Sequence, residues 1–136
     1  MNELVKQANA VFQNDRFATD TCGAKIQSIT PEEVICTMDI TEKHLNAAGT
    51  VMGGAIFTLA DFTFAVASNF QKTLTVSLNS QISYLGVAKG KQLISHSECI
   101  KEGRTTCFYL IHITDELGNQ VADVTITGYI KNQKIN

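Results

Sequence analysis

Two glycines and one aspartate stand out as residues that could do chemistry together. Gly53 and Gly54 open a long apolar run, and the one charged residue within that run is Asp61. Glycines at the start of a helix leave its first free backbone amides open to close approach, and the helix dipole favours negative charge there. Such amides can stabilise the oxyanion that forms when a carbonyl group is attacked. The glycine pair therefore indicates an oxyanion site, and Asp61 is the second candidate group.

Helical geometry keeps these groups apart within one chain. Gly53 and Asp61 are eight positions apart in the sequence. At a rise of 1.5 Å per residue they lie roughly 12 Å from each other, too far to contact one substrate carbonyl together. If they cooperate, the Gly53 amide of one subunit must face Asp61 of another. The spacing therefore predicts an active site that is shared across a two-fold interface.

The surroundings expected for Asp61 make its charge costly. An ionised carboxylate inside a buried helix costs several kcal/mol unless it is paired or reaches a cleft. Burial would raise the pKa of Asp61, and the N-terminus of a partner helix would oppose that rise. A purely structural role, in which the carboxylate accepts a hydrogen bond from a backbone donor, remains the alternative to a functional one.

The elements that must position these groups follow from the hydrophobic pattern. Residues 55–67 are apolar on every side apart from Asp61, so they predict a buried helix. One face of a flat sheet could not cover such a helix, because its far side would meet water. Either a sheet curves around the helix, or a second copy covers the rest, or both. Residues 44–52 form the loop that leads into it.

The rest of the chain predicts one short helix and six strands. Residues 2–13 place Leu4, Ala8, Val11 and Phe12 on one helical face, whereas residues 14–23 are mixed and polar. Period-two alternation is strictest over residues 74–84, where Leu74, Val76, Leu78, Ile82 and Tyr84 share one face. The other strands are predicted at residues 24–29, 34–40, 91–100, 105–114 and 121–130. The pattern indicates an α+β fold, a curved antiparallel sheet around one long buried central helix, in a single domain over residues 1–136.

Composition narrows the range of functions. The chain has 136 residues, of which 44% are hydrophobic, and a formal net charge of -2. This length supports an ordinary core, and the lack of a cluster of Lys and Arg argues against nucleic-acid binding. The N-terminus does not read as a secretory signal, and residues 55–67 are shorter than the roughly 20 residues that span a bilayer. We therefore expect a cytoplasmic protein without a membrane partner.

The four cysteines do not suggest a metal or redox site. Their positions, at 22, 36, 99 and 107, contain no CxxC pair and no zinc-type spacing with histidine. They are expected to be small buried hydrophobes in a reducing compartment. We expect neither a metal nor a separate cofactor. Motifs for a serine nucleophile, a dinucleotide or a P-loop are also missing from the sequence.

The central stretch carries a family resemblance. The residues that carry it are Leu45-Asn46, Gly49, Gly53-Gly54, Phe57, Leu59-Ala60-Asp61, Phe64-Ala65 and Asn69, followed by the alternating strand over residues 75–84. This pattern resembles the hotdog-fold acyl-CoA thioesterases, specifically their phenylacetyl-CoA (PaaI-like) branch. The resemblance covers nearly the whole chain. It implies hydrolysis of a coenzyme A thioester to a free acid and CoA, with coenzyme A as part of the substrate.

The resemblance also implies roles for individual residues. Asp61 matches the aspartate that activates water or attacks as a nucleophile, and Gly53 matches the amide donor to the thioester carbonyl. Asn46 matches a loop asparagine that helps to place substrate or water. Gly54 and Met52 adjoin this donor and would contact the substrate. Ser77 is the best match to a hydroxyl that assists in some members, although it could equally be an ordinary strand residue.

One departure from the family pattern concerns Met52. The branch usually has histidine immediately before the glycine pair, and methionine offers only a weak acceptor in its place. We expect the fold and the general site to survive this change, which leaves the rate and the preferred substrate open. The alternatives are a non-catalytic acyl-CoA binding or sensing protein and, less favoured, a hotdog hydratase or dehydratase, which normally needs a histidine partnered with an acid. The acyl group, the pathway, the surface that holds the CoA nucleotide, and the choice between homodimer and homotetramer are not determined.

Overall fold

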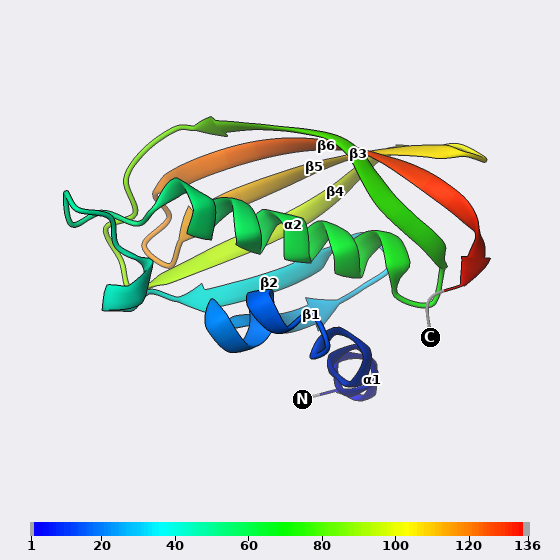
Figure 1. Cartoon of the computed structure of the whole chain (residues 1–136), viewed down its shortest axis with the longest axis horizontal. Coiled ribbons are helices and arrows are strands. Elements are labelled where there is room, and N and C mark those ends of the chain that lie inside the picture. Colours follow the sequence, from blue (N-terminus) through cyan, green and yellow to red (C-terminus); the bar gives the residue numbers. More distant parts are fainter. Residues whose placement is uncertain (1, 135–136) are drawn as a thin grey trace.

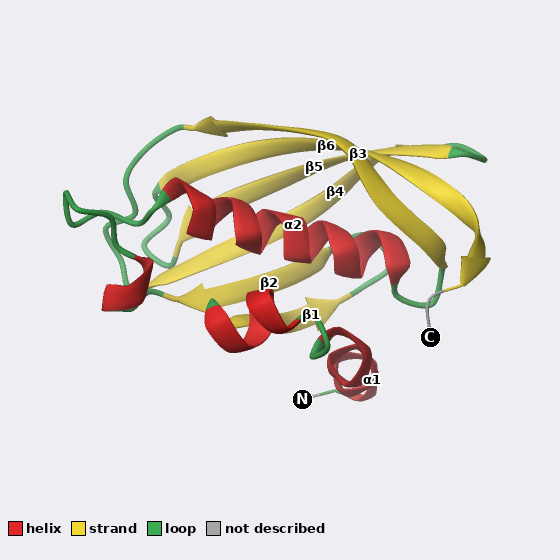
Figure 2. Ribbon diagram, in the orientation of Figure 1, coloured by secondary structure: helices red, strands yellow, loops and turns green. Residues whose placement is uncertain are grey.

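A curved antiparallel sheet wraps around one long helix in the computed structural model, which describes residues 2–134 (Figures 1 and 2). The helix α2 (Gly53–Asn69) lies in the hollow of six strands in the order β1-β2-β4-β5-β6-β3. The short helix α1 (Glu3–Phe12) packs outside, beside β1. The strands are β1 (Ala24–Ile29), β2 (Val34–Asp39), β3 (Thr73–Tyr84), β4 (Gln92–Glu102), β5 (Thr106–Asp115) and β6 (Gln120–Lys134). The predicted α+β hotdog architecture is confirmed.

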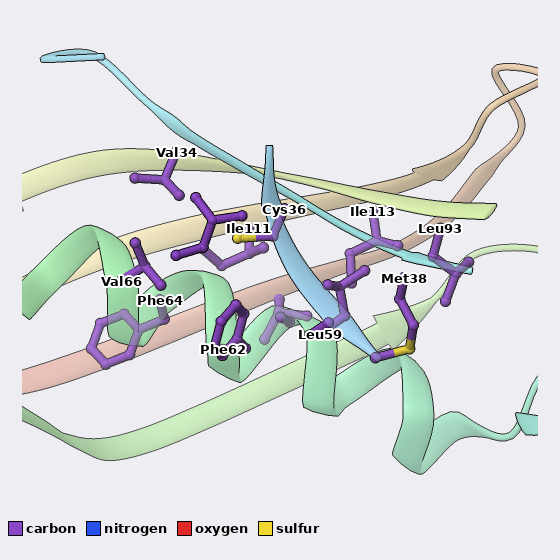
Figure 3. Close-up of a cluster of buried hydrophobic side chains, with 14 of the residues drawn as sticks. Val34, Cys36, Met38, Leu59, Phe62, Phe64, Val66, Leu93, Ile111 and Ile113 are labelled. Carbon is purple, nitrogen blue, oxygen red and sulfur yellow. The ribbon is translucent and has the colours of Figure 1, made fainter. Parts of the chain in front are cut away.

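The core lies between α2 and the concave face of the sheet. Period-two alternation in β5 directs Cys107, Tyr109, Ile111 and Ile113 inward, as predicted, and all four are buried. They meet the buried side of α2, where Leu59, Phe62 and Phe64 lie (Figure 3). Fully burying one large apolar side chain stabilises the folded state by about 1.5–3 kcal/mol. The labelled core residues in Figure 3 are Val34, Cys36, Met38, Leu59, Phe62, Phe64, Val66, Leu93, Ile111 and Ile113.

The outer side of α2 is not covered within one chain. Gly54 and Asp61 are exposed, and Phe57, Thr58 and Ala65 are half-buried on the same stripe of the helix. The sequence pattern predicts that the sheet, a second copy or both cover the helix, and within one chain the sheet alone leaves Asp61 exposed. The reason is that the sheet curves around one side of the helix only.

Strand β3 departs from its predicted alternation. A β-bulge lies between Ser77 and Asn79, where the pairing with β6 shifts by one residue. The extra residue reverses which side chains face inward, because successive side chains alternate. Leu78, predicted to share a face with Ile82 and Tyr84, is therefore 61% exposed.

The bulge determines where Ser77 points. Ser77 pairs with Gly128 in β6, and cross-strand partners lie on the same face of a sheet. A Cβ at Gly128 would meet Cys107 and Phe64, so that face is the concave one. Ser77 consequently lies on the side of the sheet that holds α2, although it is exposed near the strand edge.

The segment before β1 contains structure that the sequence pattern does not predict. Residues 17–21 form one turn of π-helix, in a stretch expected to be irregular. In α1 the buried face consists of Val5, Ala8 and Phe12, whereas Leu4 is exposed.

One cysteine, Cys99, is exposed, whereas the other three are buried, and all four are free thiols. Within residues 2–134, no helix is long and apolar enough to cross a membrane.

The end of α2 is fastened to β3 by Asn69. The Asn69 side chain accepts a hydrogen bond from the Thr75 amide at 2.7 Å and donates to the Thr75 carbonyl at 3.2 Å. It also donates to the Ala65 carbonyl at 2.9 Å. Because Asn69 and Thr75 are both buried, these backbone groups have little access to water. Asn69 therefore fixes the direction in which the chain leaves the helix.

Replacing Asn69 with alanine is expected to lower the free energy of unfolding by about 1–3 kcal/mol, because the buried Thr75 amide loses its acceptor. Urea unfolding followed by circular dichroism measures the change. The matched control is Asn79→Ala, which removes an exposed carboxamide from β3. Equal stability of the two variants would contradict the assigned role of Asn69.

Candidate active site

The first turn of α2 presents free amides at the mouth of a pocket. The amides of Ala55 and Ile56 donate to the Met52 carbonyl, whereas those of Gly53 and Gly54 have no hydrogen-bond partner among residues 2–134. Met52 occupies the N-cap position without a side-chain cap bond and is 57% exposed. Beside Gly53 lies a pocket of about 340 Å³, which Gly54 does not line. It is lined by Thr50, Val51, Gly53, Ile56, Tyr84, Gly86, Val87 and Ala88.

The two glycines serve different purposes. A Cβ at Gly53 would lie 2.7 Å from the Tyr84 Oη and 2.9 Å from Cζ, so Gly53 makes room for the tyrosine ring. A Cβ at Gly54 would meet only the end of the Met52 side chain, at 3.8 Å. The sequence pattern suggests that both glycines open the amides to a ligand. The space beside the backbone is open at Gly54, whereas at Gly53 the protein fills it.

Asn46 shapes the loop that leads into the helix. Its Oδ1 accepts hydrogen bonds from the amides of Ala48 and Thr50, and its Nδ2 donates to the Thr50 hydroxyl at 3.0 Å. Gly49 completes this turn with a φ of +83°, a conformation that favours glycine. Asn46 is exposed on the loop before the glycine pair. Its predicted contact with substrate or water stays a prediction.

Asp61 lines a different pocket, on the outer side of α2. This pocket has a volume of about 500 Å³ and lies between the helix and the segment around the π-helical turn. The side chain is exposed, yet nearby protein still desolvates it, and this desolvation raises the pKa of Asp61. The negative charge of Asp15 raises that pKa further. The lining residues are Asp15, Arg16, Phe17, Ala18, Phe57, Thr58, Asp61 and Phe62.

The single chain does not bring the two predicted groups together. The pocket at Gly53 and the pocket at Asp61 have no lining residue in common. Asn46 and Met52 lie near the first pocket in the chain, and Ser77 lies apart from both, on the concave side of β3. This separation agrees with the distance expected from helical rise.

Two residues near the site are missed by sequence reasoning. Asp15 is one of many surface carboxylates, and only the fold places it near Asp61, in the lining of one pocket. The neighbouring apolar residues Phe17 and Ala18 are the one local signal, and both line that pocket. Tyr84 is predicted only as one residue of the alternating strand, yet its hydroxyl donates a hydrogen bond to the Gly53 carbonyl at 3.1 Å.

The histidines lie elsewhere. His44 is buried, with Nδ1 accepting from the Thr41 amide and Nε2 bonded to the Cys22 carbonyl, so neither ring nitrogen is available to replace a histidine at position 52. Desolvation lowers the pKa of His112, but its hydrogen bonds to Asp123 at 2.8 Å and to Glu98 at 3.4 Å outweigh this effect, so the pKa is raised. Its neighbours Ile111 and Ile113 face α2, so His112 lies on the convex face, away from both pockets. No group of three or more potential metal ligands occurs among residues 2–134.

Comparisons with known proteins point to one family. A sequence model of the thioesterase superfamily matches residues 48–122. Acyl-coenzyme A thioesterase 13 of Homo sapiens is 32% identical over 109 residues, which make up 77% of this chain and 78% of that protein. Acyl-coenzyme A thioesterase PaaI of Escherichia coli is 32% identical over 119 residues, or 86% of this chain and 84% of that protein.

Solved structures agree with this assignment. The E. coli PaaI protein from the phenylacetic acid degradation operon matches with a TM-score of 0.88 and 26% identity, covering 98% of this chain and 100% of that chain. A hypothetical thioesterase protein from Streptococcus pneumoniae, solved with coenzyme A, matches with a TM-score of 0.81 and 28% identity over 90% of this chain and 98% of that one. Sequence, fold and helix-start geometry lead to the same conclusion: the chain belongs to the thioesterase superfamily, in which it is a hotdog thioester hydrolase of the PaaI-like branch.

Proposed function

We propose that the protein hydrolyses acyl-CoA thioesters to a free acid and CoA, in active sites that two subunits share. The names of its relatives and the coenzyme A bound to the S. pneumoniae neighbour support this substrate class. The observation that carries the proposal is that one helix presents free amides at one pocket and a carboxylate with a raised pKa at another. We keep the predicted cytoplasmic location, which the free thiols of the four cysteines support.

In the proposed reaction, Asp61 activates a water molecule that attacks the thioester carbonyl, and the amides at the start of the partner subunit's helix stabilise the product of this attack. The Asp61 carboxylate takes a proton from water, and the resulting hydroxide adds to the carbonyl carbon. The amides of Gly53 and Gly54 from the other subunit stabilise the oxyanion, and the helix dipole adds to this effect. The carbon–sulfur bond then breaks, and the CoA thiolate leaves and takes up the proton. Direct attack by Asp61, with a transient anhydride, would use the same arrangement.

The length and composition of β3 support pairing with a second copy. Strand β3 is an edge of the sheet, 12 residues long, and contains no charged residue and no proline. Free edge strands are normally short or protected by charge, because an open edge pairs with other chains. The opposite edge, β1, has 6 residues, carries Lys25 and contacts α1 and the π-helical turn. We therefore propose that β3 is the edge at which two subunits meet, and the choice between dimer and tetramer stays open.

Asp61→Asn is expected to lower thiol release by about 100-fold or more, because the amide cannot accept the proton from water. The assay uses short-chain, medium-chain and aromatic CoA thioesters with a thiol reagent. CoA binding by calorimetry should persist in the variant, since the fold and the helix-start amides are unchanged. Binding without turnover in both proteins would reject the enzyme and favour the non-catalytic acyl-CoA binding protein, an alternative that Met52 keeps open.

The pH dependence of turnover should reveal the effect of the Asp15 charge on the pKa of Asp61. Asp61 must be ionised to act, so activity rises as the pH passes upward through its raised pKa. Asp15→Asn removes a negative neighbour and lowers that pKa, which moves the acid limb of the kcat/KM profile to lower pH. The control is Asp39→Asn, an exposed carboxylate at the end of β2. A wild-type profile that stays flat through the acid range would count against Asp61 as the base.

Leu78→Lys is expected to weaken subunit association and activity together, because two-fold symmetry brings two like charges to an edge that is otherwise uncharged. Light scattering after size-exclusion chromatography measures the mass, and thiol release is assayed on the same fractions. Leu117→Lys is the matched control, since Leu117 is as exposed as Leu78 but lies in the turn between β5 and β6. A fully active monomer would overturn the shared site.

A further inference from the structure

The start of α2 has little of the usual support for a helix terminus. The N-cap residue Met52 provides no side-chain hydrogen bond. The next two residues are Gly53 and Gly54, the residue type that loses the most conformational freedom on folding. An amide that stabilises an oxyanion must nevertheless be held in place before the reaction begins. Other groups must therefore hold this turn.

Two side chains hold the carbonyls of the glycine pair. The Thr58 hydroxyl donates to the Gly54 carbonyl at 2.8 Å, from one turn further along the same helix. The Tyr84 hydroxyl donates to the Gly53 carbonyl at 3.1 Å, from the last residue of β3. Among residues 2–134, Tyr84 is thus the side chain of the sheet that hydrogen-bonds to the first turn of the helix.

The contact between Tyr84 and Gly53 is closer than the hydrogen bond requires. A Cβ at position 53 would lie 2.7 Å from Oη, 2.9 Å from Cζ and 3.2 Å from Cε1. The ring therefore occupies the space that any other residue would need for its side chain. The φ of Gly53 is not in the left-handed region, so this close approach is the reason for glycine at this position.

The direction of the Gly54 amide follows from the same contact. The Gly53 carbonyl and the Gly54 N–H belong to one planar trans peptide unit, in which they point in opposite directions. A hydrogen bond that fixes the carbonyl therefore fixes the N–H, and it also polarises that N–H as a donor. Gly54 is the position where the space beside the backbone is open.

We propose that Tyr84 is a positioning residue of the thioesterase site, which aims the Gly54 amide at the substrate carbonyl through its contacts with Gly53. This inference rests on the proposed function. It gives β3 a second role, because the other end of this strand is fastened to the end of α2 through Asn69 and Thr75. The strand at the proposed subunit edge thus holds both ends of the helix that carries the amides and Asp61.

Tyr84→Phe tests the hydroxyl while it keeps the ring. Because misplacement of an oxyanion donor affects the transition state more than substrate binding, kcat should fall about tenfold while KM changes less than about twofold. The matched control is Tyr109→Phe, which removes a hydroxyl that donates to the Ala67 carbonyl of α2, at the end remote from the glycine pair. Equal kcat values for the two variants would overturn the proposal.

A double-mutant cycle tests the ring contact. Gly53→Ala alone should displace Tyr84 and lower kcat, because its methyl group clashes with the ring. Adding Tyr84→Ala should cause no further loss, since both changes break the same contact. Losses that multiply would show that the two residues act independently, against the proposal.

An NMR measurement separates this inference from the proposed function. In protein labelled with ¹⁵N-glycine, the backbone order parameter of Gly54 should be about 0.85 in the wild type and fall towards about 0.6 in Tyr84→Phe. Tyr109→Phe should leave it unchanged. This result would support the positioning role even if no thioester were hydrolysed, whereas an unchanged Gly54 order parameter in Tyr84→Phe would overturn it even if hydrolysis were confirmed.

Discussion

The packing of α2 into the hollow of the curved sheet is the contact on which the rest of the structure depends. It buries the inward residues of β2, β4 and β5 against one side of the helix, and this burial supplies most of the core. The same contact leaves the opposite stripe of the helix uncovered, with Gly54 and Asp61 exposed on it. The groups that could do chemistry therefore lie on a rigid element at a surface.

The geometry of a helix then limits what one subunit can do. Its rise separates the free amides at its start from the carboxylate two turns later by roughly 12 Å, and the two groups line separate pockets. In the proposed site, each subunit thus carries two halves that do not meet. An uncharged edge strand beside them provides a surface on which a symmetry mate could complete both halves.

Electrostatics distinguishes the two halves. The start of α2 favours negative charge, because its free amides and dipole point outward. The pocket of Asp61 disfavours negative charge, since desolvation and the neighbouring Asp15 both raise the pKa of that carboxylate. A carboxylate with a raised pKa is the better proton acceptor, and an amide cluster is the better anion receptor, so each half suits a different step of thioester hydrolysis.

The sequence by itself determined the class of the fold and the candidate chemistry, because both depend on local patterns. Periodicity located the strands and the central helix, and the glycine pair with Asp61 indicated the site. Tertiary structure decided what local patterns cannot reach. The bulge after Ser77 depends on pairing with β6, and the exposure of Asp61 depends on how far the sheet curves. Asp15 lies near Asp61 in the lining of one pocket, and Tyr84 bonds to Gly53. These pairs are 46 and 31 positions apart in the sequence, so only the folded chain brings them together.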